Sequence, residues 1–582
     1  MKGSRKAWLG ATAALVAAAI AVAAWLGITG GSMDKATEDA EYTGRGGAFK
    51  NALATIDTPD PSVVYKDGYY YMTFTHNGAD IMVMKSRTLD FKNAAKKVVW
   101  YPPVDTMYSA NLWAPEIQYL RGKWYIYFAA DDGRNENHRM YALEAETDDP
   151  LGPYSFKGQV TDDTNRWAID GLVMELEEKL YFVWSGWEGD VNVSQNTYIA
   201  PMSDPLTISG PRVRIGEPDL AWEKAGGPPY IHEGQAILRK DGRTFIAYSG
   251  AGSWTPYYSI GLLALEPGAD PLEPSNWRKS ETPLFAMDEE AGVYGPGHNS
   301  FVASPDGTET WIVYHATSGP EDGWNNRKAR AQRIAWNDEG LPEFGKPLSL
   351  DTAIAAPSSE SVYRAEHAIR EGGKLTFDLI PATKETTVPV LLHYRNDTDA
   401  PAAVTVVANG ESVEIPLPAA TGKTGYAYAE AKLRQGMNEI SVAVPEGEDR
   451  VKLLAIETVR YEAEDAQAEG DSAAEDNPFA SGWGAAKLAG GEGSAVRFGN
   501  VRVPVKGEYR VRLAIANPSA ETLTIEAEVN GARRSIEVGP TGRNEFAVAE
   551  AELPLRLGPN QITLKLTQAG YAVAVDYMDI WR

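Results

Sequence analysis

The stretch PYIHEGQAILRKDGRTFIAYSG, residues 229–250, decides the fold. A lone acidic residue, Glu233, lies among small residues, and an apolar run follows from Ala236 to Leu238. An Asp-Gly turn then leads into a second run that contains Phe245 and Tyr248. Two apolar runs joined by a Gly-containing turn predict a half-buried β-hairpin.

The chain contains four more stretches of this kind: TPDPSVVYKDGYYYMTFT (58–75), WAPEIQYLRGKWYIYFAA (113–130), AIDGLVMELEEKLYFVWS (168–185) and GPGHNSFVASPDGTETWIVYHA (295–316). Alignment on the second strand makes five aromatic residues equivalent: Tyr71, Tyr125, Tyr181, Phe245 and Trp311. Nine to thirteen residues upstream of each lies one polar residue: Asp60, Glu116, Asp170, Glu233 and His298. Units of 54 to 66 residues, each with short strands and aromatic residues, predict a five-bladed β-propeller.

The polar residue of each unit is the functional signal. The innermost strand of each blade lines the central channel of a propeller, so these five positions are expected to converge on the axis. A single Asp or Glu near a turn is usually a cap or a solvated side chain. Clustered like charges cost stability unless their pKa values differ, so five in register predict a functional site.

Composition limits the classes of function. The chain has 582 residues, 16 Trp, 28 Tyr, no Cys and a net charge of −25. This acidity argues against nucleic acid or an anionic membrane as a partner. Trp and Tyr suit sugar-binding sites, because a sugar presents an apolar C–H face to an aromatic ring, although most of them are expected to fill cores. No G-x-S-x-G, H-E-x-x-H, phosphate-loop or EF-hand motif is present.

The N-terminal residues predict export. Three basic residues precede an uncharged apolar run from Trp8 to Ile28, which indicates a signal peptide or N-terminal anchor over residues 1–30. The run is long enough to span a bilayer, so cleavage stays open, and the protein is expected to be secreted or anchored at a bacterial cell surface. Residues 31–47 resemble a polar linker.

Three folded domains are expected after the linker. Residues 48–355 form the propeller. Residues 358–457 and 458–582 contain matching segments, such as YRAEHA (363–368) and YEAEDA (461–466), and predict two tandem β-sandwiches. The fold class is therefore all-β, a five-bladed propeller followed by two β-sandwich domains. The second sandwich has an extra Gly-rich segment, in which Trp483 is either a sugar platform or a residue buried at the sandwich edge.

Three acidic residues of the repeated units suit glycosidic bond hydrolysis. The reaction needs two carboxyl groups beside the bond, a general acid with a raised pKa and a base or nucleophile. Asp60, Asp170 and Glu233 supply an acid, a base and a third charge that tunes the acid. The residues alone suggest a propeller with a carboxylate-lined pocket.

The motifs TPDPSVVYKDGYYY, NLWAPEI, AIDG, HEGQAIL and YGPGHNSF, in this order, resemble glycoside hydrolase family 43. The resemblance covers residues 50–350 and implies a five-bladed propeller that acts on arabinose- and xylose-containing polysaccharides. It implies that Asp60 is the general base, Glu233 the general acid and Asp170 the carboxylate that raises the pKa of the acid. It also implies inversion at the anomeric carbon, with a water between base and sugar.

The same resemblance suggests further site residues. His298 matches a channel histidine that lies beside a bound ion, often Ca²⁺, or that forms hydrogen bonds in the pocket floor. Trp113 and Glu116 match the lining from the second blade, and Arg330 matches an Arg that anchors a sugar hydroxyl or a catalytic carboxylate. Two aromatic residues just after strands are either sugar subsites or packing residues: Trp187 and Trp254. Gln235 stands where many members have Pro, without an expected loss of activity.

Residues 458–582 resemble a carbohydrate-binding module of family 6 or 35, on the AE-A opening and the DYMDIWR ending, and such a module is a second expected place for Ca²⁺. Residues 358–457 resemble a shortened relative of it. The module would hold the enzyme on an insoluble polysaccharide by raising its effective concentration.

The leading interpretation is an exported inverting α-L-arabinofuranosidase that releases terminal arabinose from arabinan or arabinoxylan of plant cell walls, with no cofactor needed for the chemistry. The alternatives are a β-xylosidase or an endo-arabinanase with the same three carboxyl groups. From another class, a non-catalytic glycan-binding propeller is also open. The linkage (α-1,2, α-1,3 or α-1,5) and exo against endo action stay undecided.

Overall fold

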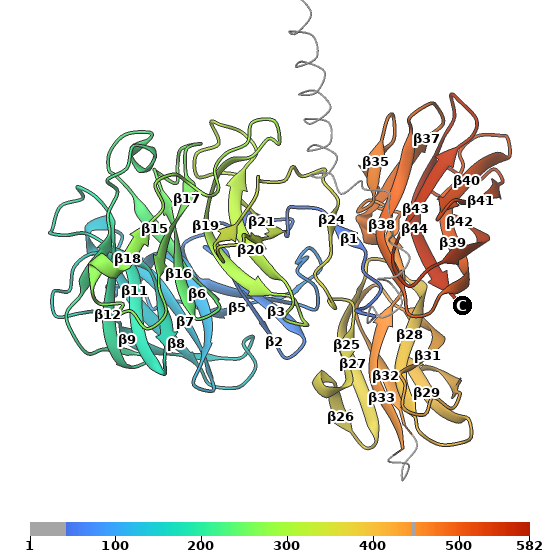
Figure 1. The fold of residues 1–582 in the computed structure, drawn as a ribbon, viewed down its shortest axis with the longest axis horizontal. Coiled ribbons are helices and arrows are strands. Elements are labelled where there is room, and N and C mark those ends of the chain that lie inside the picture. The colour runs from blue at the N-terminus through green and yellow to red at the C-terminus, as the bar shows by residue number, and fades with distance from the viewer. Residues whose placement is uncertain (1–41, 445–449) are drawn as a thin grey trace, which may run out of the picture.

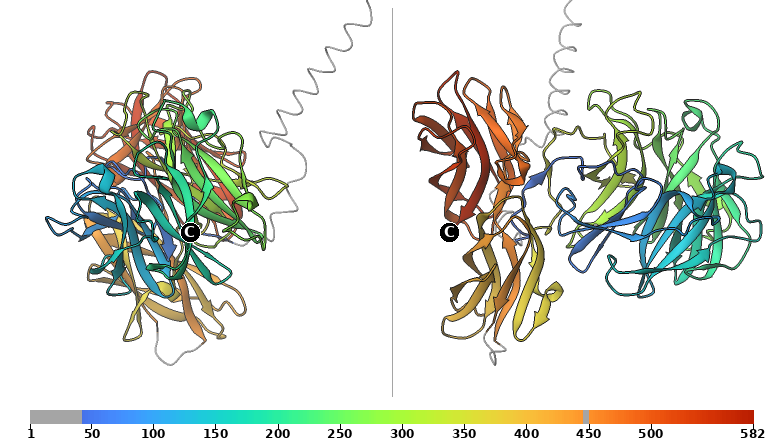
Figure 2. Two further views of the ribbon diagram at one scale, coloured as in Figure 1. Left: turned by 90° about the vertical axis from the view of Figure 1, so that its left-hand side faces the viewer. Right: turned by 180° about the vertical axis from the view of Figure 1, so that it is seen from behind.

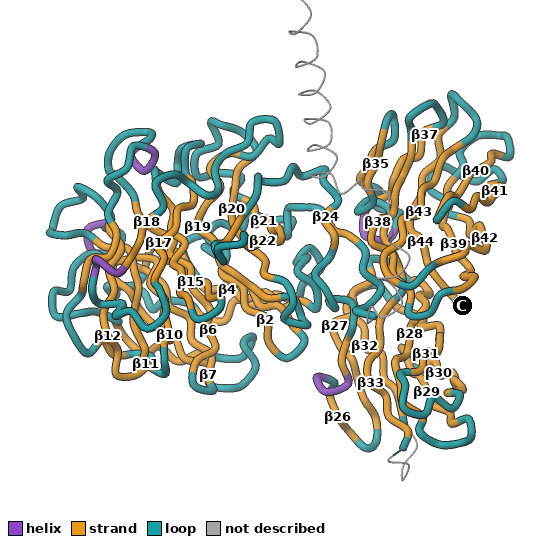
Figure 3. The backbone as a smooth tube through the Cα atoms, in the orientation of Figure 1, coloured by secondary structure: helices purple, strands orange, loops and turns teal. Residues whose placement is uncertain are grey.

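The computed structural model describes residues 42–444 and 450–582, and strands dominate them (Figures 1 and 3). The predicted signal or anchor over residues 1–30 and most of the predicted linker lie outside the described residues. Within the described part of the chain, no helix is long and apolar enough to cross a membrane. Residues 42–444 and 450–582 contain five short 3₁₀ helices: η1 (Asn135–Asn137), η2 (Trp222–Lys224), η3 (Pro274–Asn276), η4 (Ala365–His367) and η5 (Ser481–Trp483).

Five antiparallel sheets follow one another in the first half of the chain. The first contains β2 (Ser62–Lys66), β3 (Tyr69–Thr73), β4 (Ile81–Ser86) and β5 (Ala95–Trp100), and the second contains β6 (Ala110–Leu120), β7 (Lys123–Asp131), β8 (Arg139–Ala145) and β9 (Tyr154–Gln159). The third contains β10 (Ala168–Leu176), β11 (Lys179–Gly186), β12 (Asn196–Asp204), β13 (Thr207–Ile208) and β14 (Val213–Gly216). The fourth contains β15 (His232–Lys240), β16 (Arg243–Gly250), β17 (Ser259–Leu265) and β18 (Trp277–Lys279), and the fifth β19 (Tyr294–Ala303), β20 (Thr310–Thr317) and β21 (Lys328–Arg333). Two small pairs complete this half: β1 (Ala48–Phe49) with β24 (Ile354–Ala355), and β22 (Ala335–Trp336) with β23 (Pro342–Glu343).

The first strands of the five sheets form a closed circuit. Each of β2, β6, β10, β15 and β19 contacts the next, and β19 returns to β2. Residues 53–58, just before the first blade, lie along β21 and complete the fifth blade. Their backbone N–H groups at Leu53 and Thr58 donate to the carbonyls of Ala329 and Arg327. The predicted five-bladed propeller is therefore the fold of this half, and apolar clusters fill the spaces between neighbouring blades.

Strand register confirms the alignment of the aromatic residues but corrects the alignment of the polar ones. All five aromatic residues are buried, and each pairs with a residue four positions after one that has a positive φ. These left-handed residues are Asp60, Ala114, Asp170, Gly234 and His298. The equivalent residues of the second and fourth blades are thus Ala114 and Gly234, not Glu116 and Glu233. In the second to fifth blades the pairing also slips at this point, as at a β-bulge, which turns nearby side chains toward the axis.

Two β-sandwiches form the second half of the chain (Figures 1 and 2). The first has the sheets β25-β33-β28-β31 and β26-β27-β32-β29-β30, made of β25 (Tyr363–Arg364), β26 (Ile369–Glu371), β27 (Lys374–Ala382), β28 (Thr386–Asn396), β29 (Ala402–Ala408), β30 (Glu411–Leu417), β31 (Gly425–Leu433), β32 (Gly436–Ala443) and β33 (Val451–Thr458). The second has the sheets β36-β37-β44-β39-β42, with β34 beside β44, and β35-β38-β43-β40-β41. Its strands are β34 (Arg460–Glu462), β35 (Gln467–Glu469), β36 (Ala473–Asp476), β37 (Gly484–Ala489), β38 (Ala495–Val503), β39 (Gly507–Ala516), β40 (Leu523–Val529), β41 (Ala532–Val538), β42 (Ala547–Leu555), β43 (Gly558–Leu566) and β44 (Ala572–Trp581).

The two sandwiches repeat one plan. Asn438 and Asn560 lie at matching positions of β32 and β43, and the side-chain amide of each donates to three backbone carbonyls of its own sandwich. The second sandwich adds β36 and β37 at the edge of one sheet. The extra segment predicted from the sequence therefore contributes β37 and the turn that carries Trp483.

Residues 42–47 pack between the two sandwiches, although the sequence suggested a linker there. The Tyr42 hydroxyl donates to Glu457 Oε1 (2.7 Å), the Arg45 N–H donates to Glu457 Oε2 (2.8 Å), and the Gly47 N–H donates to the Asn500 carbonyl (3.0 Å). Buried Glu457 of the first sandwich and partly buried Asn500 of the second thus hold a polar segment that composition alone marks as solvated.

Candidate active site

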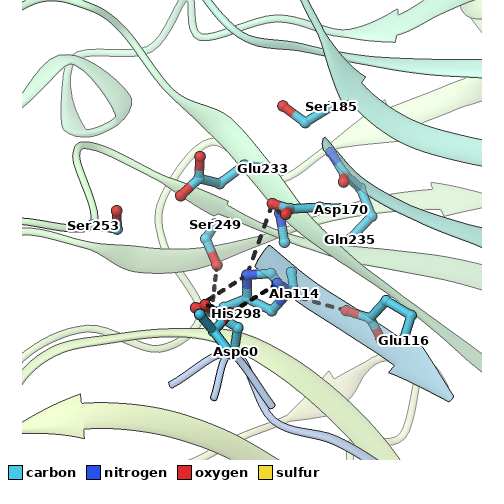
Figure 4. A network of polar contacts seen from close by, with 12 residues as sticks. Asp60, Ala114, Glu116, Asp170, Ser185, Glu233, Gln235, Ser249, Ser253 and His298 are labelled. Carbon is cyan, nitrogen blue, oxygen red and sulfur yellow. Dashed lines mark hydrogen bonds and ion pairs between the residues drawn. The ribbon is translucent and has the colours of Figure 1, made fainter. Parts of the chain in front are cut away.

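The strands at the propeller axis bring four carboxyl groups around one imidazole. Asp60, Glu116, Asp170, Glu233 and His298 come from, or directly precede, the first strands of the five blades, and we call them the axis cluster (Figure 4). All five residues are buried. The structure therefore brings together the five polar residues that the sequence singled out.

His298 lies at the centre of the axis cluster. Its Nε2 is 3.1 Å from Glu116 Oε1, and its Nδ1 is 3.6 Å from Asp60 Oδ1 and 3.8 Å from Asp170 Oδ2. Burial alone would lower the pKa of His298, but Asp170, then Asp60 and Glu116, raise it to about 10. The ring is therefore an imidazolium at neutral pH and supplies the positive charge of the cluster.

Asp60 is held in its ionised form. The Thr75 hydroxyl donates to its Oδ2 (2.7 Å), and Arg327 Nη1 donates to its Oδ1 (3.2 Å). Its backbone N–H donates to Nδ1 of His315 (3.0 Å). Burial would raise the pKa of Asp60, but the charge of Arg327, followed by that of His298, holds it well below its usual range. This carboxylate can accept a proton from a water molecule.

Glu233 has the opposite character. The Tyr258 hydroxyl donates to its Oε1 (3.0 Å). Burial, followed by the charge of Asp170, raises the pKa of Glu233 to about 8. At neutral pH this carboxyl group keeps its proton and can donate it.

Asp170 lies between these two environments. The backbone N–H of Gly234 donates to its Oδ2 (2.9 Å), which ties Asp170 to the residue next to Glu233. Burial raises the pKa of Asp170 to about 6, while His298 opposes that rise. Its charge is therefore close enough to Glu233 to set the proton affinity of that carboxyl group.

The axis cluster does not fit a metal ion bound through His298. A protonated imidazole has no free lone pair, and both ring nitrogens already face carboxylate oxygens. No group of three or more His, Cys, Asp or Glu residues in the described ranges is arranged to hold a metal. The expected Ca²⁺ at this position is not supported, and the imidazolium occupies the place of a cation.

The remaining predicted residues of the second, third and fourth blades have different surroundings. Glu116 was predicted to line the site, and its Oε1 is bound to Nε2 of His298 (3.1 Å). Trp113 is half-buried and stacks on His138, with ring centroids 4.0 Å apart. Trp187 is only 4% exposed and stacks on Trp167 with ring centroids 4.7 Å apart, which favours the packing alternative over the sugar subsite. Trp254 is also partly exposed, on the loop that follows β16.

The predicted contact of Arg330 with a catalytic carboxylate is not present in the structure. Arg330 is fully buried within β21, where its guanidinium donates to the Thr317 carbonyl and the Ser318 hydroxyl instead of to a carboxylate of the axis cluster. Arg327, three residues earlier and just before β21, contacts Asp60. Sequence reasoning also missed three polar partners: Thr75, Tyr258 and His315. Thr75 and His315 stand inside quoted motif stretches, which was the available signal.

Trp483 lies far along the chain from the axis cluster, in η5 of the second sandwich. It is 47% exposed and lines a cavity of about 790 Å³ between the first blade and both sandwiches. Nearby, both carboxylate oxygens of Asp576 have partners: the Ser481 N–H (2.7 Å) and Lys384 Nζ (2.7 Å). The described residues of this module contain no group of three or more His, Cys, Asp or Glu that could hold a metal, so the Ca²⁺ expected there is not supported either.

The axis cluster can carry out acid–base chemistry on a glycosidic bond. It combines an ionised carboxylate with a protonated carboxyl group, and a third carboxyl group keeps their pKa values apart. This division of roles is the one that glycoside hydrolases use. The all-β propeller and this site together define the class as a glycoside hydrolase.

Comparison with known proteins gives the family. The model of the glycosyl hydrolases family 43 matches residues 49–342, and the chain belongs to this family. It is 34% identical over 311 residues to an extracellular exo-α-(1→5)-L-arabinofuranosidase of Streptomyces avermitilis, which covers 52% of this chain and 64% of that protein. It is 32% identical over 345 residues to α-L-arabinofuranosidase 43 of Humicola insolens, which covers 56% of this chain and 71% of that protein.

Solved structures include a similar protein. The crystal structure of the α-L-arabinofuranosidase from Lactobacillus brevis is 34% identical, and the match covers 52% of this chain and 98% of that one, with a TM-score of 0.49. By contrast, the chain spans less than two thirds of the length of the Streptomyces avermitilis relative. These matches do not establish the two sandwiches as carbohydrate-binding modules.

Proposed function

We propose that this protein is an exo-acting α-L-arabinofuranosidase that works with inversion. The observation that carries the proposal is the separation of proton affinities at the axis, with Asp60 ionised and Glu233 protonated at neutral pH. The names of the relatives support arabinofuranose as the sugar that is released.

In this proposal Asp60 is the general base. It removes a proton from a water molecule, which attacks the anomeric carbon from the face opposite the leaving oxygen. Arg327 and Thr75 keep the Asp60 carboxylate oriented through contacts of 3.2 and 2.7 Å. One O–H bond of water breaks, a C–O bond forms, and the proton resides on Asp60.

Glu233 is the general acid. It donates its proton to the glycosidic oxygen as the C–O bond breaks, and the Tyr258 hydroxyl then stabilises the carboxylate that remains. Asp170 raises the pKa of Glu233 between turnovers, and His298 balances the negative charge of the cluster. Glu116 positions His298 through its Nε2.

Export and a plant cell-wall polymer as substrate complete the proposal. The basic and apolar N-terminal sequence supports export, and the Streptomyces avermitilis and Streptomyces chartreusis relatives are named extracellular. Arabinan and the arabinose branches of arabinoxylan both present terminal arabinofuranose. A bacterial source and a polysaccharide-anchoring role of residues 458–582 belong to the same proposal.

Product analysis tests the activity. Purified protein is incubated in parallel with linear α-1,5-arabinan, arabinoxylan and xylo-oligosaccharides, and products are separated by chromatography. Arabinose released alone from the start is expected, and the preferred polymer identifies the linkage. Xylose would indicate a β-xylosidase, a ladder of oligosaccharides an endo-arabinanase, and no product a glycan-binding propeller.

Proton NMR of the first product tests the mechanism. Inversion predicts that β-arabinofuranose appears first from an α-linked substrate and then mutarotates. Initial α-arabinofuranose would contradict the role of Asp60 as a base that activates water.

A further inference from the structure

The propeller end that carries the axis cluster also carries most of its exposed apolar side chains. Ala168 pairs with Gly186, and His232 with Gly250, so the loops that follow the second strands leave beside the starts of the inner strands. Among the described propeller residues, the large exposed apolar side chains other than Tyr119 and Leu350 lie on loops at this end: Tyr101, Val104, Met107, Val191, Val193, Tyr257 and Trp324. Gathered exposed apolar side chains mark binding surfaces.

Trp324 is the largest of these side chains, and it is fixed in place. Although it is 61% exposed, its Nε1 donates to the Ser253 hydroxyl (3.1 Å). Its ring meets the ring of Trp254 edge to face, with centroids 5.8 Å apart and planes at 76°. Two loops, 251–258 and 318–327, therefore hold one indole in a set orientation with much of its surface in solvent.

Both loops lead directly to the reacting groups. Arg327 Nε donates to the Trp324 carbonyl (3.2 Å), and its Nη1 donates to Asp60. On the other loop, Tyr258 donates to Glu233. Figure 4 shows Ser253 on the Glu233 side of the site, away from Glu116. Trp324 is thus connected through Arg327 to the ionised carboxylate of Asp60. Through Ser253 it is connected to the loop whose Tyr258 contacts the protonated carboxyl group of Glu233.

We infer that Trp324, with Trp254 at its edge, is the stacking platform for the leaving sugar and sets the preference for a saccharide leaving group. This inference rests on the proposed function. The leaving sugar departs on the side of the general acid, and the loop that anchors Trp324 through Ser253 also carries the tyrosine that contacts Glu233. A furanose or pyranose offers an apolar C–H face to the indole, and binding energy gained there lowers the barrier at the bond.

A pair of substrates isolates the platform. The full chain is assayed with α-1,5-arabinotriose, whose leaving group is a saccharide, and with α-L-arabinofuranosyl fluoride, whose leaving group is one atom. Trp324→Ala is expected to lower kcat/KM for arabinotriose about 10- to 100-fold and to change kcat/KM for the fluoride less than about threefold. Trp324→Phe, which keeps a ring, is expected to recover most of the loss.

Matched variants make the result specific. Tyr119→Ala removes an exposed aromatic side chain at the far end of β6 and is expected to leave both substrates unaffected. Ser253→Ala removes only the anchor and is expected to lie between wild type and Trp324→Ala. Equal losses on both substrates would overturn the inference, because Trp324 would then act through Arg327 on Asp60. Unchanged values on both would overturn it too.

The outcome is separate from the fate of the proposed function. If wild-type protein cleaves neither substrate, the arabinofuranosidase proposal fails. If it cleaves the xylose counterparts instead, the same variants are compared on xylotriose and xylosyl fluoride, where the same difference is expected. If wild type cleaves both arabinosides and the two losses do not differ, only the platform fails.

Discussion

Two clusters of carboxyl groups in this molecule both contain members whose pKa is raised by burial, and the clusters differ in chemistry. One is the axis cluster. The other, which we call the junction cluster, consists of Glu462, Glu464, Asp465 and Asp576 in the second sandwich, close to the cavity shared with the first blade. Burial raises the pKa of Glu462 to about 7 and of Asp465 to about 6, and it raises the pKa of Glu464 and Asp576 as well.

The clusters differ in how their pKa values are distributed. In the junction cluster all four pKa values move upward, although Lys384 of the neighbouring sandwich binds Asp576 (2.7 Å) and Arg460 and Lys92 oppose the rise at Glu462 and Asp465. In the axis cluster the value of Asp60 moves down while that of Glu233 moves up. The cations Arg327 and His298 lie beside Asp60, whereas the charge of Asp170 raises the pKa of Glu233.

A perturbed pKa therefore does not identify a catalytic site by itself. Acid–base catalysis needs one group that holds a proton and another that lacks one at the same pH. At the axis, Arg327 and His298 beside Asp60 create this difference, whereas in the junction cluster the Lys384–Asp576 pair joins the two sandwiches. Matched substitutions in the two clusters test this difference.

The largest expected effect comes from removing a proton donor in each cluster. Glu233→Gln keeps the shape of a protonated carboxyl group but cannot donate a proton, and we expect turnover of arabino-oligosaccharides to fall about 10²- to 10⁴-fold. Glu462→Gln, the matched change in the junction cluster, is expected to leave turnover unchanged. The measurement is kcat for both variants by steady-state kinetics. Comparable losses of turnover in the two variants would contradict a catalytic role that is specific to the axis cluster.

A smaller effect is a shift in pH dependence. Asp170 raises the pKa of Glu233, and activity needs Glu233 protonated, so the alkaline limb of kcat/KM is expected near pH 8. Asp170→Asn removes the negative charge, Glu233 then loses its proton more readily, and the limb moves to lower pH by about one unit. Asp576→Asn serves as the control, with an unmoved limb. An upward shift for Asp170→Asn would contradict the sign of this coupling.

Much of the fold and the centre of the site were predictable from the sequence. The five aromatic residues repeat at fixed distances from a turn, and the register confirms them because an inner hairpin cannot slip without exposing its buried face. Asp60, Asp170 and His298 share one left-handed position, so their convergence followed from the repeat. Their catalytic roles stay predictions.

What could not be predicted depends on single-residue slips and on partners from distant segments. Glu233 precedes the left-handed residue of its blade and Glu116 follows it by two, yet both reach the cluster because the bulge turns neighbouring side chains. Trp187 is buried in the cluster between the second and third blades, where Trp167, from the loop before β10, stacks on it. Arg327 directly precedes β21 and Arg330 lies within it, and only the structure shows that Arg327 is the one that contacts Asp60.

A third effect concerns the cation of the junction cluster. Lys384→Met leaves the buried carboxylate of Asp576 with the Ser481 N–H as its remaining partner. Because Lys384 is about one third exposed, we expect a modest loss of about 1–3 kcal/mol in the free energy of unfolding, measured by denaturant titration. Activity on soluble substrates should persist. Asp576→Asn added to Lys384→Met should recover part of the loss, and a double variant no more stable than the single one would refute the pairing.

The smallest effect is the pH dependence of stability. A carboxyl group whose pKa is raised by folding keeps a proton that the unfolded chain releases near pH 4.5, so its contribution is full below that pH and is lost as pH rises through the folded value. For Glu462 that window runs up to about pH 7. Calorimetry should therefore show the melting temperature falling between pH 5 and pH 7, and Glu462→Gln should flatten this slope. Glu233→Gln should also flatten it, with its window reaching about pH 8, because the same physics acts at the axis. A slope unchanged in both variants would mean that neither buried acid holds its proton in the folded protein, and the acid–base division at the axis would lose its physical basis.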